Sequence, residues 1–149
     1  IILPVMTISF SALYTVVSHN LEFVIVTLVL AVLFVLVSTI LHSAIAAPLV
    51  VRVIFGVING ILAIATLWGV WFWLQADISA ALNFLLSGPV KSFSTAYDMA
   101  QFYSYQLMPR PDVVINFGPT GIRILWLIET LAFGLSPILG ALIRKKHVA

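Results

Sequence analysis

The sequence contains no cysteine. This absence excludes thiol nucleophiles, disulfide exchange, iron–sulfur ligation and cysteine-based zinc sites. Charge is scarce as well, because Asp, Glu, Lys and Arg together make up 8% of the 149 residues, against roughly 25% in ordinary soluble domains. Seven basic and five acidic residues make no basic face, so nucleic-acid binders are excluded, and disordered chains are excluded with them.

Apolar surface, in contrast, is abundant. Hydrophobic residues make up 62% of the chain, and the mean hydropathy is +1.19. A water-soluble fold of this size cannot bury so much apolar surface, so we expect an integral membrane protein. The expected fold class is all-α: a single transmembrane domain over residues 1–149, built as a bundle of four transmembrane helices, with short interfacial helices in one extramembrane segment.

Four stretches are long enough to cross a membrane. A spanning helix needs about 20 mostly apolar residues, because the hydrocarbon core is about 30 Å thick and a helix rises about 1.5 Å per residue. We predict spans at about 2–18, 21–45, 49–75 and 119–143. The first stretch lacks the cationic start and small-residue cleavage site of a signal peptide, so it is interpreted as a span. The polar residues at 18–20 predict a turn between the first two spans, and Pro48 predicts a break before the third.

The segment at about 77–117 is the only long stretch outside these spans. Asp77 is suited to cap a short helix at 78–86. A second helix is predicted at 92–106, because its aromatic residues recur at helical spacing on one face. An amphipathic helix with aromatic residues is typical of the membrane interface, so we expect both helices to lie against the membrane surface or a partner.

Basic residues near the span ends indicate the orientation. A basic run at 144–146 follows the fourth span, and Arg52 lies at the start of the third, so both fall on one side of a four-span bundle. We therefore expect both termini on the cytoplasmic or matrix side of a bacterial inner or organellar membrane, with 77–117 on the periplasmic or luminal side. Aromatic rings favour the headgroup level, and the residues expected there are Trp68, Trp71, Trp73, Trp126, Tyr97 and Tyr103.

Glu129 is the most informative polar residue. It lies about ten residues, or about 15 Å, from the start of its span, which places it near the bilayer centre. An ionisable group at that depth costs on the order of several kcal/mol, so it should face protein or water. It is either a titrating or ion-coordinating carboxylate or a structural hydrogen-bonding lock. We favour the lock, since no second membrane carboxylate extends a relay; Asn59 and Thr66 are its expected partners in an intramembrane polar site.

Small residues recur at helical spacing on the third and fourth predicted spans. On the third span they include a GxxxG pair, and on the fourth they follow Glu129. Small side chains let two helices approach closely in a membrane. The residues predicted for helix packing are Gly56, Gly60, Ala63, Ala132, Ser136 and Gly140.

The three histidines argue against a cofactor held within one chain. His19 lies at one end of its predicted span and His42 near the opposite side of the membrane, while His147 lies in the tail. A membrane haem needs two imidazoles at the same depth on facing helices, and one chain does not provide such a pair. A symmetric dimer could still pair two copies of His42. We expect no metal, no cofactor and no enzymatic activity, because no catalytic constellation is found. A bound lipid is the one ligand that the composition favours.

The preferred functional hypothesis is a small accessory or scaffold subunit of a larger membrane complex. Its expected partners are membrane lipids and either other membrane subunits or copies of the same chain, with no nucleic acid. The alternative is a small oligomeric transporter or channel component that uses Glu129. A third class, a lipid- or quinone-modifying enzyme at the outer interface, has no catalytic residues behind it. A dry, packed Glu129 favours the scaffold, whereas a hydrated cavity favours transport.

Overall fold

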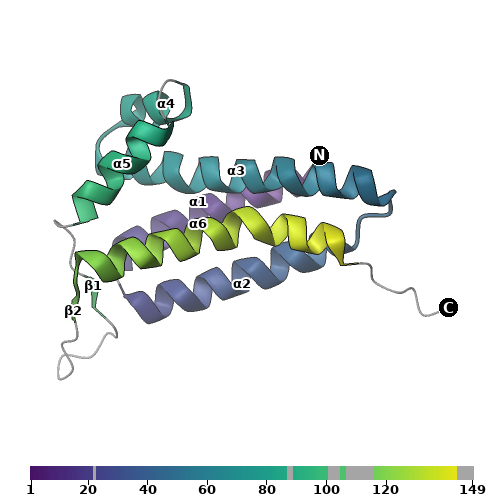
Figure 1. The fold of residues 1–149 in the computed structure, drawn as a ribbon, viewed down its shortest axis with the longest axis horizontal. Helices are drawn as coiled ribbons and strands as arrows, with labels where there is room; N and C mark the ends of the chain where they lie inside the picture. Colours follow the sequence, from purple (N-terminus) through teal and green to yellow (C-terminus); the bar gives the residue numbers. More distant parts are fainter. Residues whose placement is uncertain (22, 87–88, 101–104, 107–115, 144–149) are drawn as a thin grey trace.

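The computed structural model describes residues 1–21, 23–86, 89–100, 105–106 and 116–143. This part of the chain is almost entirely helical (Figure 1). Its elements are α1 (Ile2–Leu21), α2 (Val24–Ser43), α3 (Leu49–Gln75), α4 (Ile78–Leu86), α5 (Pro89–Met99), β1 (Tyr105–Gln106), β2 (Asn116–Phe117) and α6 (Pro119–Leu142). The two short strands pair antiparallel, with Tyr105 opposite Phe117.

The four long helices, α1, α2, α3 and α6, are long and apolar enough to cross a membrane. They contain 20, 20, 27 and 24 residues, and 20 helical residues extend about 30 Å, which is the thickness of the hydrocarbon core. The prediction of a helical fold with four candidate spans is therefore confirmed. The observed helix ends lie within three residues of the predicted ones.

The connection between α1 and α2 lies later in the chain than predicted. The predicted turn at 18–20 is wrong, because these residues belong to α1. The Ser18 hydroxyl donates to the Thr15 carbonyl at 3.2 Å, and the Asn20 side-chain amide donates to the Val16 carbonyl at 2.6 Å. Because these side chains bond to carbonyls of the preceding turn, they are accommodated within the helix instead of ending it.

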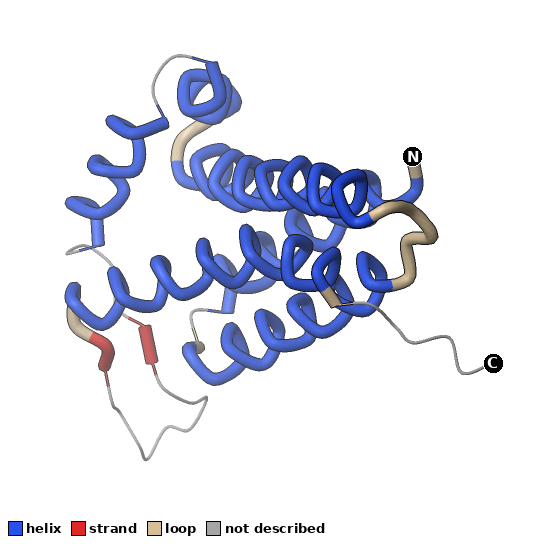
Figure 2. Tube along the Cα trace, turned by 45° about the vertical axis from the view of Figure 1, so that its right-hand side comes forward, coloured by secondary structure: helices blue, strands red, loops and turns tan. Residues whose placement is uncertain are grey.

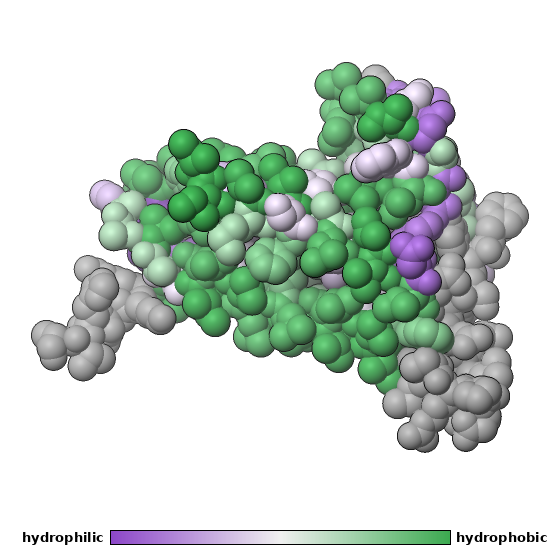
Figure 3. All heavy atoms as spheres, turned by 180° about the vertical axis from the view of Figure 1, so that it is seen from behind, coloured by the Kyte–Doolittle hydropathy of each residue, from purple (hydrophilic) through white to green (hydrophobic). Residues whose placement is uncertain are grey.

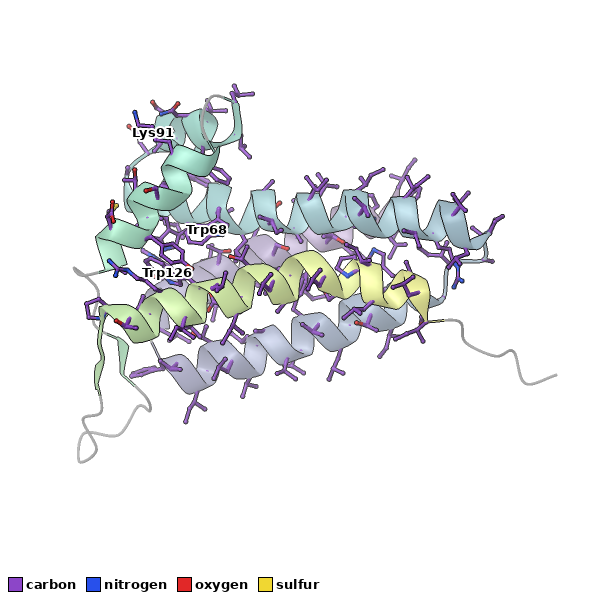
Figure 4. All side chains as sticks on the ribbon, in the orientation of Figure 1. Trp68, Lys91 and Trp126 are labelled. Atoms are coloured by element: carbon purple, nitrogen blue, oxygen red, sulfur yellow. The ribbon has the colours of Figure 1, made fainter. Side chains whose placement is uncertain are left out.

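The four long helices form one bundle in which α6 packs against both α3 and α2, and α1 packs against both α3 and α2 (Figures 1 and 2). The start of α1 and the end of α6 lie at the same end of this bundle, which we call the terminal end. Trp68 and Trp126 lie toward the opposite end, next to α4 and α5 (Figure 4), and Trp71 packs against both of their rings, so we call this the tryptophan end. The arrangement therefore gives the bundle two distinct ends.

The lateral surface of the bundle is apolar. The face in Figure 3 is almost wholly hydrophobic along the bundle, and hydrophilic residues gather beside α4 and α5. Side chains such as Val32 on α2, Ile61 on α3 and Leu131 on α6 are each more than half exposed. A bundle with this surface is compatible with a membrane-embedded protein, since lipid tails would solvate it.

The segment between α3 and α6 agrees with the prediction only in its first half. Helix α4 has the predicted bounds, and Asp77 caps it by accepting a 2.9 Å hydrogen bond from the Ala80 backbone amide. Helix α5 begins at Pro89, which suits a first helical position because proline has no N–H to leave unpaired. The predicted helix at 92–106 is wrong at its end, because 105–106 form β1 and bond to β2 instead.

Glycines allow α6 to approach its neighbours backbone to backbone. A Cβ atom on Gly60 would collide with the Gly134 carbonyl oxygen, and one on Gly56 would lie 2.9 Å from another backbone carbonyl oxygen of α6. Gly140 meets α2 in the same way, because its Cβ would lie 2.5 Å from the Thr39 carbonyl oxygen. The glycines predicted for helix packing thus lie between helices of the same chain.

Replacing Gly60 with alanine should therefore destabilise the bundle, by about 1–3 kcal/mol for an overpacked contact. Gly69→Ala is the matched control, since it lies on the same helix and its Cβ would meet only Leu85 at 3.9 Å. We expect the thermal midpoint in mild detergent to fall for Gly60→Ala and to hold or rise for Gly69→Ala. Equal midpoints for the two variants would contradict the close α3–α6 approach.

Candidate functional site

Glu129 lies in the interior of the bundle, where 7% of its surface is exposed. It comes from the middle of α6, and its carboxyl group accepts a hydrogen bond from the side chain of Tyr14 on α1. A buried carboxyl group needs such partners, because unmatched polar groups are costly away from water. Glu129 therefore joins α6 to α1.

A small cavity lies beside the Glu129 carboxyl. Its volume is about 20 Å³, which is enough for one water molecule, since about 10–15 Å³ is the minimum. Half-buried Ser18 and His19 form its rim toward the tryptophan end. The cavity is lined by Thr15, Ser18, His19, Thr27, Leu67, Trp68, Trp71, Trp126 and Glu129.

The hydroxyl groups of the cavity leave oxygen lone pairs available. The Thr15 hydroxyl donates to the Ser11 carbonyl at 2.8 Å, and the Ser18 hydroxyl donates to the Thr15 carbonyl, so both oxygens are still free to accept. The Thr27 hydroxyl is 1% exposed at the residue level and has no hydrogen-bond partner among the described residues. At the rim, His19 Nδ1 lies 3.1 Å from the side-chain nitrogen of Gln75. The wall is therefore rich in acceptors.

Trp68, Trp71 and Trp126 form the other wall of the cavity, and the first and last of them are labelled in Figure 4. The ring of Trp126 lies 5.8 Å from that of Trp68 and 5.3 Å from that of Trp71, edge to face. The Trp68 indole N–H donates to the Thr130 hydroxyl at 3.0 Å. Edge-to-face packing adds about 0.5–1.5 kcal/mol per pair beyond the area buried. These three rings are buried between the helices, whereas Trp73 is 55% exposed; their position at the headgroup level stays a prediction.

A layer of stacked aromatic rings closes the bundle interior next to this cavity. Phe133 is fully buried, and its ring stacks on Phe34 at 3.8 Å and contacts Tyr14 at 4.6 Å. Beyond the layer, toward the terminal end, lies a second cavity of about 10 Å³ that includes Ser38 and His42. The ring layer therefore lies between the cavity beside Glu129 and a smaller, mostly apolar cavity that Ser38 and His42 also line.

The structure does not bring Glu129, Asn59 and Thr66 into one site. Asn59 is fully buried, but its side-chain amide donates to the Phe55 carbonyl at 2.9 Å and it does not line the Glu129 cavity. Thr66 lines a different depression, between α3 and α4. The reason is that Glu129 faces α1, and Trp68 of α3 fills the adjoining space against α6.

The remaining predicted packing residues lie inside the bundle. Ala63 is fully buried, Ala132 packs against the core, and the Ser136 carbonyl accepts from the Thr39 hydroxyl at 3.4 Å. Among the predicted interfacial residues, Tyr97 donates to the Arg123 carbonyl at 3.2 Å, and Arg123 donates back to the Tyr97 carbonyl at 2.9 Å. Tyr103 lies outside the described residues.

The sequence interpretation missed the polar faces of α1 and α2. Thr7, Ser11, Tyr14, Thr15 and Ser18 on α1 are spaced by three, four or one residues and face the interior together. On α2, Thr27, Ala31, Phe34, Ser38 and His42 repeat at three and four residues, and all are buried. This spacing was the signal that could have found them, because residues i, i+3 and i+4 share a helix face.

Within the described ranges, no group of three His, Asp or Glu side chains is placed to hold a metal ion. Comparisons of the chain with protein-family models, with curated proteins and with solved structures found no match. The features that bear on function are therefore those of its own core: the buried carboxyl, the polar cavity beside it and the ring layer.

Replacing Tyr14 with phenylalanine tests the contact between α1 and Glu129. The ring and its packing on Phe133 are kept, while the hydroxyl is lost. Such contacts in membranes contribute about 0.6 kcal/mol on average and at most about 1.7 kcal/mol. We therefore expect the substitution to lower the free energy of unfolding by an amount in that range. Tyr97→Phe is the control, because this half-buried tyrosine of α5 also donates one hydrogen bond but is less shielded from water, so its loss should lower stability less. Equal losses of stability for the two variants in detergent unfolding would show that Tyr14 does not hold α1 to α6.

Proposed function

We propose that this chain is a small accessory or scaffold subunit of a larger membrane complex, with its four long helices in the bilayer. The observation that carries the proposal is that the interior offers no wide polar space among the described residues, while the exterior is openly apolar. Phe133 and its neighbouring rings occupy the centre of the bundle, and the two small cavities of about 20 and 10 Å³ hold at most about one water molecule each. A larger space of about 200 Å³ lies between α1 and α2, but the described residues that line it are apolar apart from the Tyr14 hydroxyl. An interior of this kind supports a structural role.

The partner surface is best sought on the outside of the bundle. The glycines of α3 and α6 already serve contacts within the chain. Large apolar side chains remain exposed along α2, the most hydropathic of the four helices, including Val29, Val32 and Leu36. A helix of another membrane subunit, or of a second copy of the chain, suits this face of α2. Membrane lipids suit the remaining apolar surface of the bundle.

The proposal includes an orientation. The start of α1 and the end of α6 lie at one end of the bundle, and Arg52 of α3 lies toward that same end. The basic run at 144–146 lies outside the described residues, but it directly follows α6 in sequence. Basic residues favour the cytoplasmic side, which supports cytoplasmic or matrix termini and a periplasmic or luminal segment between α3 and α6.

Gentle detergent extraction followed by native mass measurement tests the proposal. We expect the chain to be recovered in an assembly heavier than its own 16.3 kDa. A photocrosslinking residue at Val32, on the exposed face of α2, should trap the neighbouring subunit, whereas one at buried Ala63 should not. Recovery only as a lone monomer, with no product from Val32 in intact membranes, would overturn the scaffold proposal.

Transport is the second candidate, and the polar cavity beside Glu129 favours it. A carboxyl group next to a water-sized space is typical of ion pathways in membranes. Transport requires the ring layer of Tyr14, Phe34 and Phe133 to open, or a path to form between copies of the chain. The two functions differ in what Glu129 must do, since a lock must only hydrogen-bond, whereas a carrier must change its charge.

Paired substitutions of Glu129 separate the two functions. In a scaffold, Glu129→Gln should leave complex abundance nearly normal, because the amide keeps the shape and still pairs with Tyr14. Glu129→Leu should lower abundance, because it removes the polar contact. In a transporter, Glu129→Gln should assemble normally but abolish proton or ion flux, since an amide does not titrate. Complex abundance and flux into proteoliposomes are measured side by side for both variants.

A further inference from the structure

The cavity beside Glu129 has the donor chemistry of a cation site. Its polar wall offers the carboxylate of Glu129 and the hydroxyl oxygens of Thr15, Ser18 and Thr27. Oxygen ligands of this kind suit hard cations, and the described residues that line the cavity carry no sulfur atom. The Thr27 oxygen is the decisive group, because it is buried, lines the cavity and has no partner among the described residues.

Charge selects a monovalent ion. Among the described residues, Glu129 is the only acidic side chain in the cavity lining, and none of the described lysines or arginines lines it. Elsewhere in the described part, Arg123 is engaged with the Tyr97 carbonyl, and Arg52 lies on the first turn of α3 at the terminal end. One carboxylate balances one positive charge, whereas a divalent ion would leave an uncompensated charge in the membrane interior.

Size and walls agree with this choice. A volume of about 20 Å³ accepts one water-sized particle and is too small for a hydrated ion with a complete shell. The faces and edges of Trp68, Trp71 and Trp126 complete the wall, and aromatic faces attract cations. The half-buried rim at Ser18 and His19 supplies an entrance from the tryptophan end.

We propose that the cavity formed by Thr15, Ser18, Thr27 and Glu129 binds one sodium ion. This site goes beyond the scaffold role and does not depend on it, because an ion held between α1, α2 and α6 can be lost while the outer surface still assembles. A proton competes for the same carboxylate oxygens, so sodium affinity falls as the pH is lowered. Among the described residues, the other titratable groups next to Glu129 are Tyr14 and His19, both on α1. The described lining residues from α2 and α3 do not titrate in this range; they are Thr27, Leu67, Trp68 and Trp71.

Three indoles in the wall make the site directly observable. The full chain is purified in detergent, and its tryptophan fluorescence is followed while NaCl replaces choline chloride at constant ionic strength. Trp73→Phe serves as the background, because it removes the exposed indole outside the cavity. We expect a saturable change with sodium, and a weaker response or none with the larger potassium ion.

Thr27→Val is the principal variant, because it keeps the shape and removes the unpartnered oxygen. We expect its sodium affinity to be at least about tenfold weaker. Thr66→Val is the matched control on the α3–α4 depression and should bind sodium normally. Glu129→Gln should abolish binding, and helical content by circular dichroism shows whether each variant is folded.

A fluorescence change with pH but none with sodium would overturn the sodium site and leave only protonation of Glu129. Equal sodium affinity in Thr27→Val and Thr66→Val would also overturn it. Failure of the scaffold proposal is separate, since it is read from native mass and crosslinking at Val32. Normal assembly with lost sodium binding in Thr27→Val would support both proposals.

Discussion

The close approach of α3 and α6 is the contact on which the rest of the structure depends. Gly60 and Gly134 meet without side chains between them, and one turn further along Gly56 faces the backbone of α6. In a membrane the hydrophobic effect adds little to helix association, so close van der Waals contact between backbones is a principal source of cohesion. With α6 held against α3, its opposite face reaches α2 through Gly140, and the remaining side of the bundle is closed by α1.

The same contact decides where polar and aromatic groups can lie. Glycine contacts bring α3 and α6 close toward the terminal end, while Trp68, Trp71 and Trp126 fill the space between helices toward the tryptophan end. Glu129 lies between these two regions, on the side of α6 that faces α1. The space left beside it is polar, because α1 and α2 place hydroxyl groups there. The cavity therefore arises from the packing of all four helices.

The bundle interior holds several buried hydroxyl groups, although its lateral surface is apolar. Ser11, Thr27, Ser38 and Ser136 are each at most 6% exposed, and their hydroxyl oxygens have no hydrogen-bond partner among the described residues. Such groups would be costly in a fluid lipid environment, where no water satisfies them. Their placement inside the bundle and away from lipid connects the composition of α1 and α2 to the site beside Glu129.

The sequence by itself determined the helical fold class, the four helices long and apolar enough to span a membrane, and the cap at Asp77. These follow from local properties: hydropathy summed over about 20 residues, and a carboxylate directly before a helix. It also singled out Glu129 and the glycines, since an ionisable group in an apolar helix must face protein or water, and small residues at helical spacing allow close helix contact.

Only the tertiary structure decided which groups meet. The polar stripe through Asn59 and Thr66 shares a helix face but not a cavity, because Glu129 bonds to Tyr14 on α1 and Trp68 occupies the adjoining space. The preference of tryptophan for headgroups gives an expected depth, whereas the burial of Trp68, Trp71 and Trp126 comes from packing between α3 and α6. Ring contacts across two helices depend on a separation that no single span encodes.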